Sequence, residues 1–158
     1  MRVAILTVSD SVAAGRSEDR SGPAVRKRCE ELGWQVVAAE VCADERQLIE
    51  ARLTECIGMG IADVVLTTGG TGIGPRDVTP EATAAVCSRL IPGFGELMRA
   101  VGRQSTPRSV LSRAVAGVRE NCIVVNLPGS PKGAVESLNA VAELLPHSAQ
   151  VIRGARHD

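Results

Sequence analysis

Aromatic residues are almost missing from this chain of 158 residues, which contains one Trp, one Phe and no Tyr. Proteins usually hold single-stranded nucleic acid by stacking its bases on aromatic side chains, so that device is unavailable here. Lysine plus arginine equals aspartate plus glutamate, at 18 each, and no net field draws the protein to polyanions or anionic surfaces. We therefore expect neither nucleic acid nor a membrane as a partner.

Histidine is scarce as well, and cysteine shows no metal-binding pattern. The two histidines, His147 and His157, both lie near the C-terminus, which makes a histidine-driven triad or metal cluster improbable. The five cysteines contain no Cys-x-x-Cys pair, and their odd number and wide spacing argue against a disulfide framework or a zinc site. Several fall at apolar positions, where free cysteine behaves as a small hydrophobic residue.

Long apolar runs are also missing. No run is long enough to span a bilayer, and the apolar stretch at residues 1–6 is too short for a signal peptide. We therefore expect a cytoplasmic protein. The composition, 44% hydrophobic and 23% charged, is typical of a globular chain, and the length predicts one domain over residues 1–158.

Short branched apolar runs alternate with segments of helical periodicity. Such runs are typical of strands buried on both faces of a parallel sheet. The expected strands are 3–8, 34–41, 62–68 and 122–127, and the expected helices are 21–33, 44–58, 79–87, 94–104 and 130–145. Segment 110–118 is ambiguous between helix, strand or both in turn, and the tail 151–158 is expected to fray. The alternation predicts an α/β fold, a three-layer α/β/α sandwich with a mostly parallel central sheet.

A glycine-rich loop follows the third expected strand, with four glycines in residues 69–74. Successive backbone N–H groups in such a loop form a concavity that binds anions, and phosphate is the first candidate. The loop is not a Walker A motif, because it ends in Gly74-Pro75-Arg76-Asp77 instead of Gly-Lys-Ser/Thr. It is not the dinucleotide fingerprint either, because Pro75 occupies the position of the third glycine.

An acidic residue, Asp77, ends this loop. A carboxylate beside a phosphate repels it unless a cation lies between them, so Asp77 suggests Mg²⁺, which binds through one or two carboxylates plus substrate phosphates. The alternative is a tight turn in which Asp77 pairs with Arg76 or caps the next helix.

Polar residues also follow the other expected strands. Ser9 and Asp10 follow the first and Asp44 follows the second, where Asp44 with Gln47 also fits a helix capping box. Ser130 is a good N-cap for the last helix (as Ser21 is for the first), and the free N–H groups there, with Lys132, favour an anion. The alternative for that end is plain capping with a solvated lysine. In a parallel sheet these loops share one edge, which predicts a phosphorylated ligand and metal-assisted phosphoryl transfer.

Four ordered motifs point further. They are Thr7-Val8-Ser9-Asp10 with Asp19-Arg20-Ser21-Gly22-Pro23, Thr67-Thr68-Gly69-Gly70-Thr71-Gly72 with Pro75-Arg76-Asp77 and Thr79-Pro80-Glu81, Leu111-Ser112-Arg113, and Leu127-Pro128-Gly129-Ser130-Pro131. Together they resemble the molybdenum cofactor biosynthesis family, which includes the bacterial Mog and MoaB proteins and the G domain of gephyrin. The resemblance covers nearly the whole chain.

This resemblance implies a molybdopterin-binding domain, commonly trimeric and in some members hexameric, whose Mog-type members transfer adenylyl from Mg-ATP to molybdopterin and release pyrophosphate. It assigns Asp44 and Asp77 jointly to Mg²⁺ and substrate orientation. The residues that would hold the phosphates or line the same edge are Ser9, Asp10, Thr68, Gly69, Gly70, Thr71, Gly72, Gly129, Ser130 and Lys132. Two alternatives stay open: a pterin-binding or carrier protein without turnover, as in MoaB-like members, and an oligomeric interaction module.

Overall fold

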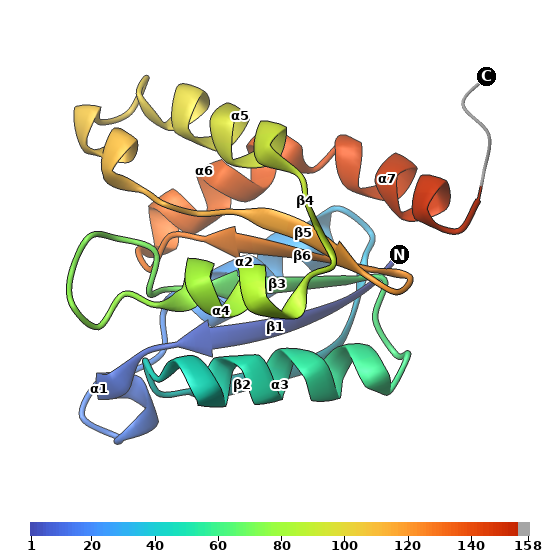
Figure 1. Cartoon of the computed structure of the whole chain (residues 1–158). Coiled ribbons are helices and arrows are strands. Elements are labelled where there is room, and N and C mark those ends of the chain that lie inside the picture. The colour runs from blue at the N-terminus through green and yellow to red at the C-terminus, as the bar shows by residue number, and fades with distance from the viewer. Residues whose placement is uncertain (155–158) are drawn as a thin grey trace.

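The computed structural model describes residues 1–154, and within them six strands form one sheet in the order β2-β1-β3-β6-β5-β4 (Figure 1). Four of them run parallel: β1 (Arg2–Val8), β2 (Gln35–Cys42), β3 (Val64–Thr68) and β6 (Cys122–Leu127). Strands β5 (Ala116–Arg119) and β4 (Arg89–Leu90) extend the sheet, β5 antiparallel to β6 and β4 antiparallel to β5. The mostly parallel sheet expected from the sequence is confirmed.

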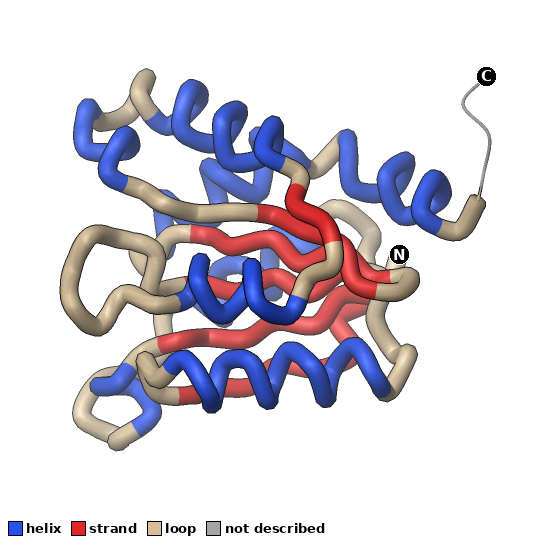
Figure 2. The backbone as a smooth tube through the Cα atoms, in the orientation of Figure 1, coloured by secondary structure: helices blue, strands red, loops and turns tan. Residues whose placement is uncertain are grey.

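Helices cover both faces of this sheet, as Figure 2 shows. One face carries α2 (Ser21–Glu31), α5 (Pro92–Gly102), α6 (Pro131–Val141) and α7 (Leu144–Ile152). The other face carries α3 (Arg46–Gly58) and α4 (Thr79–Val86). A short helix α1 (Asp10–Ala13) follows β1, and a 3-10 helix η1 (Pro107–Leu111) precedes β5. None of the helices described is both long and apolar enough to cross a bilayer.

Strand β1 shows why the sequence folds into three layers. Val3 and Ile5 point into the core under α2 and α6, whereas Ala4 and Leu6 point into the core under α3. All four are buried, so a continuous apolar run fills both cores at once. Burying each large side chain of this kind contributes about 1.5–3 kcal/mol to the stability of the fold. The central strands therefore hold the loops at their ends in fixed positions.

Several expected boundaries were wrong. Ser21 does not cap α2: it lies inside the helix, and the Asp19 carboxylate accepts the Gly22 N–H instead (3.0 Å). The expected helix 130–145 is two helices, α6 and α7, and residues 151–152 belong to α7 instead of a frayed tail. Residues 155–158 lie outside the described part of the chain. The ambiguous segment 110–118 forms helix and strand in turn, the end of η1 and then β5.

The ends of the described chain are held together by one buried acid. Asp63, with a side chain 8% exposed, accepts the Arg2 backbone N–H (2.7 Å) and forms ion pairs with Arg2 and Arg153. Burial alone would raise the pKa of the Asp63 carboxyl, but the hydrogen bonds from Arg2 and Arg153 outweigh it and lower the pKa to about 2. The ionised carboxylate therefore stabilises the fold.

Asp63→Asn is expected to lower the free energy of unfolding at pH 7 by about 2 kcal/mol, because the folded pKa lies below the ordinary value of 3.8. A depressed pKa gives stability that is present above about pH 4 and is lost as the pH falls toward 2. Urea unfolding at pH 7 and pH 3 measures the difference between the two proteins, which should shrink at pH 3. Glu50→Gln, which removes an exposed pair with Arg46, is the control and should change stability by about 0.5 kcal/mol or less. An equal difference at both pH values would contradict this role of Asp63.

Candidate active site

The loops of interest lie where the sheet topology reverses direction. Strands β2 and β3 flank β1 on opposite sides, so the connections leaving β1 and β2 run to opposite sides of the sheet. Open α/β sheets form a crevice for ligands beyond the carboxyl ends of strands at such a point. Here those ends carry Ser9 after β1 and Gly69 after β3, and the loops gather at the left of Figure 2.

The glycine loop begins in a conformation that requires glycine. Gly69 has φ +103° and Gly70 has φ +66°. A Cβ on Gly69 would lie 2.2 Å from the carbonyl oxygen of Val8, so the backbone of β1 leaves no room for a side chain. Gly69 donates its N–H to Leu127 O (3.1 Å), and Thr79 Oγ1 donates to Gly69 O (2.9 Å). The loop is thereby held to β6 and to the first turn of α4.

Asp77 closes this loop from within. Its Oδ2 accepts the backbone N–H of Gly74 (2.9 Å), and the Asp77 N–H donates to Gly74 O (3.1 Å). It neither pairs with Arg76 nor caps α4, whose N-cap residue is Val78 without a side-chain hydrogen bond. The tight turn considered as an alternative exists, but both side-chain roles proposed with it were wrong.

Asp44 is held by a tertiary contact and does not cap a helix. Its Oδ2 accepts the N–H of Asp10 (2.8 Å), and its own N–H donates to Asp10 Oδ1 (3.0 Å). The N-cap residue of α3 is Glu45, which makes no side-chain capping bond. The expected capping box at Asp44 was therefore wrong, and the carboxylate is available at the sheet edge.

The carboxyls of Asp44 and Asp10 have pKa values shifted in opposite directions, because their surroundings differ. Burial raises the pKa of Asp44, and repulsion from Asp10 and Asp77 adds to it, against the hydrogen bond from the Asp10 backbone. The pKa of Asp10 is lowered, chiefly by the hydrogen bond from Arg76, whose Nε and Nη2 each lie 3.0 Å from an Asp10 oxygen. The negative charge of Asp10 is thus balanced by an ion pair with Arg76, whereas Asp44 forms no ion pair among the described residues.

Both predicted acids line one cavity, which we call the aspartate cavity. It has a volume of about 390 Å³. The predicted site residues on its wall are Ser9, Asp44, Thr68, Gly69, Gly70, Asp77 and Gly129. Asp10 does not line it, because its carboxylate is engaged with Arg76 and with the Asp44 backbone. Ser9 lines the wall while its hydroxyl accepts the Val12 N–H (3.3 Å) as the N-cap of α1.

A second cavity adjoins the first across the glycine loop, and we call it the arginine cavity. Its volume is also about 390 Å³, and Gly70, Asp77 and Gly129 line both cavities. Thr71, Gly72 and Ser130 are the other predicted residues on its wall. The two loops approach closely, because a Cβ on Gly129 would lie 3.3 Å from the Gly69 Cα, and Thr68 Oγ1 donates to Pro128 O (2.7 Å).

The end of α6 is capped as expected. Ser130 Oγ accepts the Gly133 N–H (3.1 Å), and Pro131 takes the first helical position. Lys132 does not line either cavity: its side chain is 81% exposed, and its Nζ lies 3.8 Å from Glu136. Gly129 and Ser130 therefore lie on a cavity wall, whereas Lys132 fits the alternative of plain capping with a solvated lysine.

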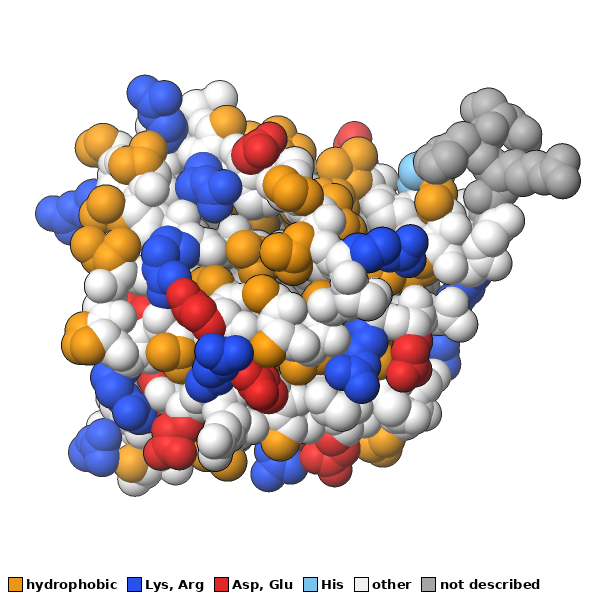
Figure 3. All heavy atoms as spheres, viewed as in Figure 1, with side chains coloured by type: hydrophobic (Ala, Val, Ile, Leu, Met, Phe, Trp, Pro, Cys, Tyr) orange, Lys and Arg blue, Asp and Glu red, His pale blue; other side chains and the backbone are white. Residues whose placement is uncertain are grey.

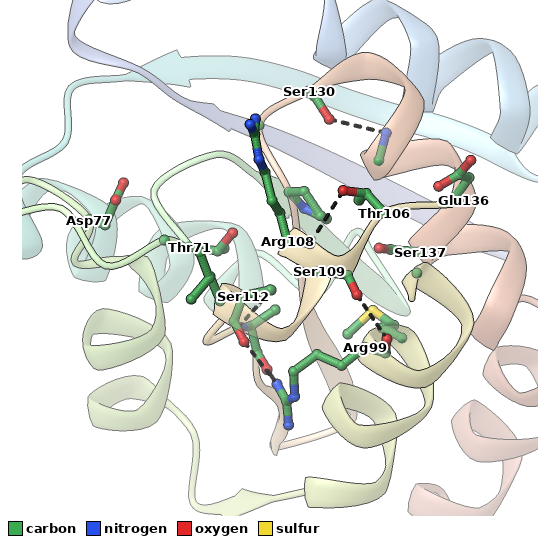
Figure 4. Close-up of a pocket in the computed structure, with 18 of the residues that line it drawn as sticks. Thr71, Asp77, Arg99, Thr106, Arg108, Ser109, Ser112, Ser130, Glu136 and Ser137 are labelled. Atoms are coloured by element: carbon green, nitrogen blue, oxygen red, sulfur yellow. Dashed lines mark hydrogen bonds between the residues drawn. The ribbon is translucent and has the colours of Figure 1, made fainter. Parts of the chain in front are cut away.

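The sequence analysis gave no role to three arginines near the site, although one of them, Arg113, stands in the motif Leu111-Ser112-Arg113. Arg99 from α5 and Arg108 from η1 line the arginine cavity, and the Arg108 side chain extends toward the end of the cavity where Ser130 lies (Figure 4). Arg99 Nη1 donates to the carbonyls of Ser112 (3.3 Å) and Ala114 (3.2 Å). The third, Arg113, contacts the glycine loop itself. The only local signal for Arg108 was the polar linker 105–109, which gives no direction for a side chain.

The donor set fits a divalent cation only together with a ligand. Within residues 1–154, no group of three or more His, Cys, Asp or Glu side chains could hold a metal. Asp44 and Asp77 supply two carboxylates in one cavity, and the pKa of Asp44 is raised by burial and by neighbouring acids. Mg²⁺ commonly binds in this way, with substrate phosphates completing its oxygen ligands.

Acidic and basic residues balance over the chain. Figure 3 shows acidic and basic side chains interspersed over the face it presents. The formal net charge is +0, with 18 residues of each sign. Recognition of a phosphorylated ligand would therefore depend on the local groups at the sheet edge.

Fold and site together define an α/β domain with a glycine loop at the switch point of its mostly parallel sheet. The chain belongs to the molybdenum cofactor biosynthesis family, since the family model described as "Probable molybdopterin binding domain" matches residues 4–147. The resemblance drawn from the four motifs is thereby confirmed.

Individual relatives agree with this assignment. The molybdopterin adenylyltransferase of Helicobacter pylori (strain 26695) is 42% identical over 156 residues, which cover 98% of this chain and 89% of that protein. The molybdopterin adenylyltransferase of Escherichia coli K12 is 36% identical, over 90% of this chain and 74% of that protein. The crystal structure of the molybdopterin biosynthesis enzyme MoaB from Thermus thermophilus superposes with a TM-score of 0.91, at 45% identity and with 99% of each chain covered.

Proposed function

We propose that this protein is a molybdopterin adenylyltransferase, which transfers the adenylyl group of ATP to the terminal phosphate of molybdopterin in molybdenum cofactor biosynthesis. The observation that carries the proposal is that Asp44 and Asp77 line one cavity, which meets a second cavity at the glycine loop. Adenylyltransferase relatives at 36% and 42% identity support it.

Two neighbouring cavities suit a reaction between two phosphorylated substrates. Each cavity has room for part of a substrate, and they share Gly70, Asp77 and Gly129. Phosphates bound from either side would therefore meet over the glycine loop, beside the N-terminus of α6. Holding two reactants in the right geometry is the main contribution that a protein makes to phosphoryl-transfer chemistry.

The reaction needs no general base from the chain. A terminal phosphate oxygen of molybdopterin is already anionic, and it forms a bond to the α-phosphorus of ATP. The bond from that phosphorus to the oxygen bridging to the β-phosphate breaks, and pyrophosphate leaves with the electron pair. When bound, Mg²⁺ would neutralise charge on the phosphates. Asp44 and Asp77 would hold it, while the N–H groups of residues 70–72 and 130, which have no acceptor within residues 1–154, would orient the phosphate oxygens.

Two broader expectations belong to the same proposal. We infer a homotrimer, with a hexamer as the alternative, and a cytoplasmic location. In such an assembly a neighbouring subunit would cover exposed apolar side chains such as Leu90, Leu97 and Leu144.

Pyrophosphate release tests the proposal. Protein incubated with molybdopterin and Mg-ATP should release one pyrophosphate for each adenylylated molybdopterin detected by mass spectrometry. Replacing Mg²⁺ with excess chelator should abolish release, because two carboxylates and the phosphates would then repel one another. The MoaB relative at 45% identity favours a second candidate, a molybdopterin-binding protein without turnover. Saturable molybdopterin binding with no pyrophosphate above background would establish that candidate and refute the enzyme.

A further inference from the structure

One arginine outside the cavities binds the glycine loop at three points. Arg113 lies between η1 and β5, and its backbone N–H donates to Thr71 O (2.8 Å). Its side chain donates from Nε to Gly72 O (2.7 Å) and from Nη2 to Asp77 O (2.7 Å). A single residue thus fixes the backbone before and after the turn that Asp77 closes.

Glu81 fixes the orientation of this guanidinium. It lies in the first turn of α4 and forms an ion pair with Arg113 through Nη1, while Nη2 lies 3.4 Å from the other carboxylate oxygen. The mutual hydrogen bond raises the pKa of Arg113 and lowers that of Glu81. Their side chains are 37% and 42% exposed, and pairs this exposed add little stability. The main effect of the ion pair is therefore to orient the Arg113 guanidinium, and its contribution to stability is small.

The contacts made by Arg113 set the direction of the loop N–H groups. In a trans peptide the C=O and the following N–H point in opposite directions, and the chain contains no cis bond among residues 1–154. Holding Thr71 O therefore turns the Gly72 N–H away from Arg113. Within the described residues this N–H has no hydrogen-bond acceptor, and Gly72 lines the arginine cavity. Holding Asp77 O likewise limits where the Asp77 carboxylate can lie.

We propose that Arg113, oriented by Glu81, is a positioning residue for the reaction. It keeps the glycine loop in the conformation that presents its N–H groups to phosphate and aims Asp77 into the cavities. The effect of Arg113 on turnover rests on the proposed function. Its effect on the conformation of the glycine loop does not depend on that function and can be measured in the free protein.

Arg113→Lys tests the role, because lysine keeps the charge but cannot bond Gly72 O, Asp77 O and Glu81 in one plane. We expect kcat for pyrophosphate release to fall about 10²-fold, the scale of a small misplacement of reacting groups. We expect hydrogen exchange at residues 70–78 of the free protein to rise about tenfold, with unchanged exchange in the sheet. Arg119→Lys is the matched control, since Arg119 Nη1 also donates to a backbone carbonyl, Val86 O (3.3 Å), away from both cavities.

A second variant separates positioning from simple stability. Glu81→Gln should lower kcat by about tenfold, less than Arg113→Lys. The double variant should be no worse than Arg113→Lys alone, because residues that act through one another are not additive. Additive losses in the double variant would overturn the coupling between Glu81 and Arg113.

Three outcomes would overturn the proposal: unchanged loop exchange in Arg113→Lys, unchanged kcat where the wild type turns over, or a rise in exchange across the whole sheet with a matching fall in Tm. The last would make Arg113 an ordinary structural residue. If the wild type itself releases no pyrophosphate, the adenylyltransferase function is refuted. The positioning role of Arg113 is then tested by hydrogen exchange in the loop and by the Kd for Mg-ATP. A Kd raised about tenfold in Arg113→Lys but not in Arg119→Lys would still support the positioning role, and equal Kd values would refute it.

Discussion

Replacing Asp77 with Asn should abolish pyrophosphate release, by a factor of about 10²–10³ in kcat or more, while molybdopterin binding is largely spared. Asparagine keeps the shape of the side chain and can still accept the Gly74 N–H, so the loop stays closed. What is lost is one of the two charges that would hold Mg²⁺ against the phosphates. Asp44→Asn should cause a loss of the same order, for the same reason.

The stability of Asp44→Asn distinguishes a functional acid from a structural one. The pKa of Asp44 is raised by burial and by its acidic neighbours, so its ionised form destabilises the fold above the ordinary pKa of 3.8. A neutral asparagine removes that penalty and can still accept the Asp10 N–H. We therefore expect Tm at pH 7 to stay the same or rise although activity is lost.

Glu45→Gln is the control for both acids, because it removes an exposed charge next to Asp44 that lines neither cavity. It should leave kcat within about twofold, as expected for a surface charge screened by solvent. Wild-type turnover in Asp77→Asn would refute the role of that carboxylate. Equal losses in Asp44→Asn and Glu45→Gln would show that general charge at this edge, and not the site, is responsible.

Gly69→Ala should unfold or severely destabilise the protein and abolish binding at the glycine loop. The φ of +103° alone costs an L-residue about 1–3 kcal/mol. The added Cβ also meets the carbonyl oxygen of Val8 at 2.2 Å, and backbone at the end of a central strand cannot move aside cheaply. We expect a loss of about 3 kcal/mol or more in the free energy of unfolding, measured by urea denaturation.

Gly58→Ala is the matched control. Gly58 is the last residue of α3, its Cβ would meet nothing within 4 Å, and its φ is not in the positive range. Alanine there should be neutral or stabilise by up to about 1 kcal/mol. If Gly69→Ala matched the wild type in both stability and Mg-ATP binding, the close approach of β1 to the loop would not be required.

The parts of the fold that follow from local pattern were predictable. The strands β1, β3 and β6 are buried on both faces, so their apolar runs stand out in the sequence. Strand β4 was missed because it is an exposed pair of residues, Arg89–Leu90, with no apolar run. The break between α6 and α7 has a local cause that was overlooked: the ring of Pro146 conflicts with the carbonyl four residues earlier, at Ala142, where α6 ends.

The candidate site divides in the same way. The glycine loop and its acid are adjacent in sequence, so Gly69, Gly70 and Asp77 could be found from spacing alone. Asp44 was ambiguous because a local capping pattern competed with a contact to Asp10, 34 positions away, that only the fold creates. The positions of Arg108 and Arg113 also depend on the fold, because neither residue is adjacent in sequence to the loop that it approaches.

A crystal structure with Mn²⁺ and the non-cleavable α,β-methylene analogue of ATP tests the central claim most directly. The anomalous signal of the metal should lie between the carboxylates of Asp44 and Asp77 and the analogue's phosphates, with phosphate oxygens over the N–H groups of residues 70–72. A metal bound elsewhere, or a triphosphate outside the aspartate and arginine cavities, would contradict the account.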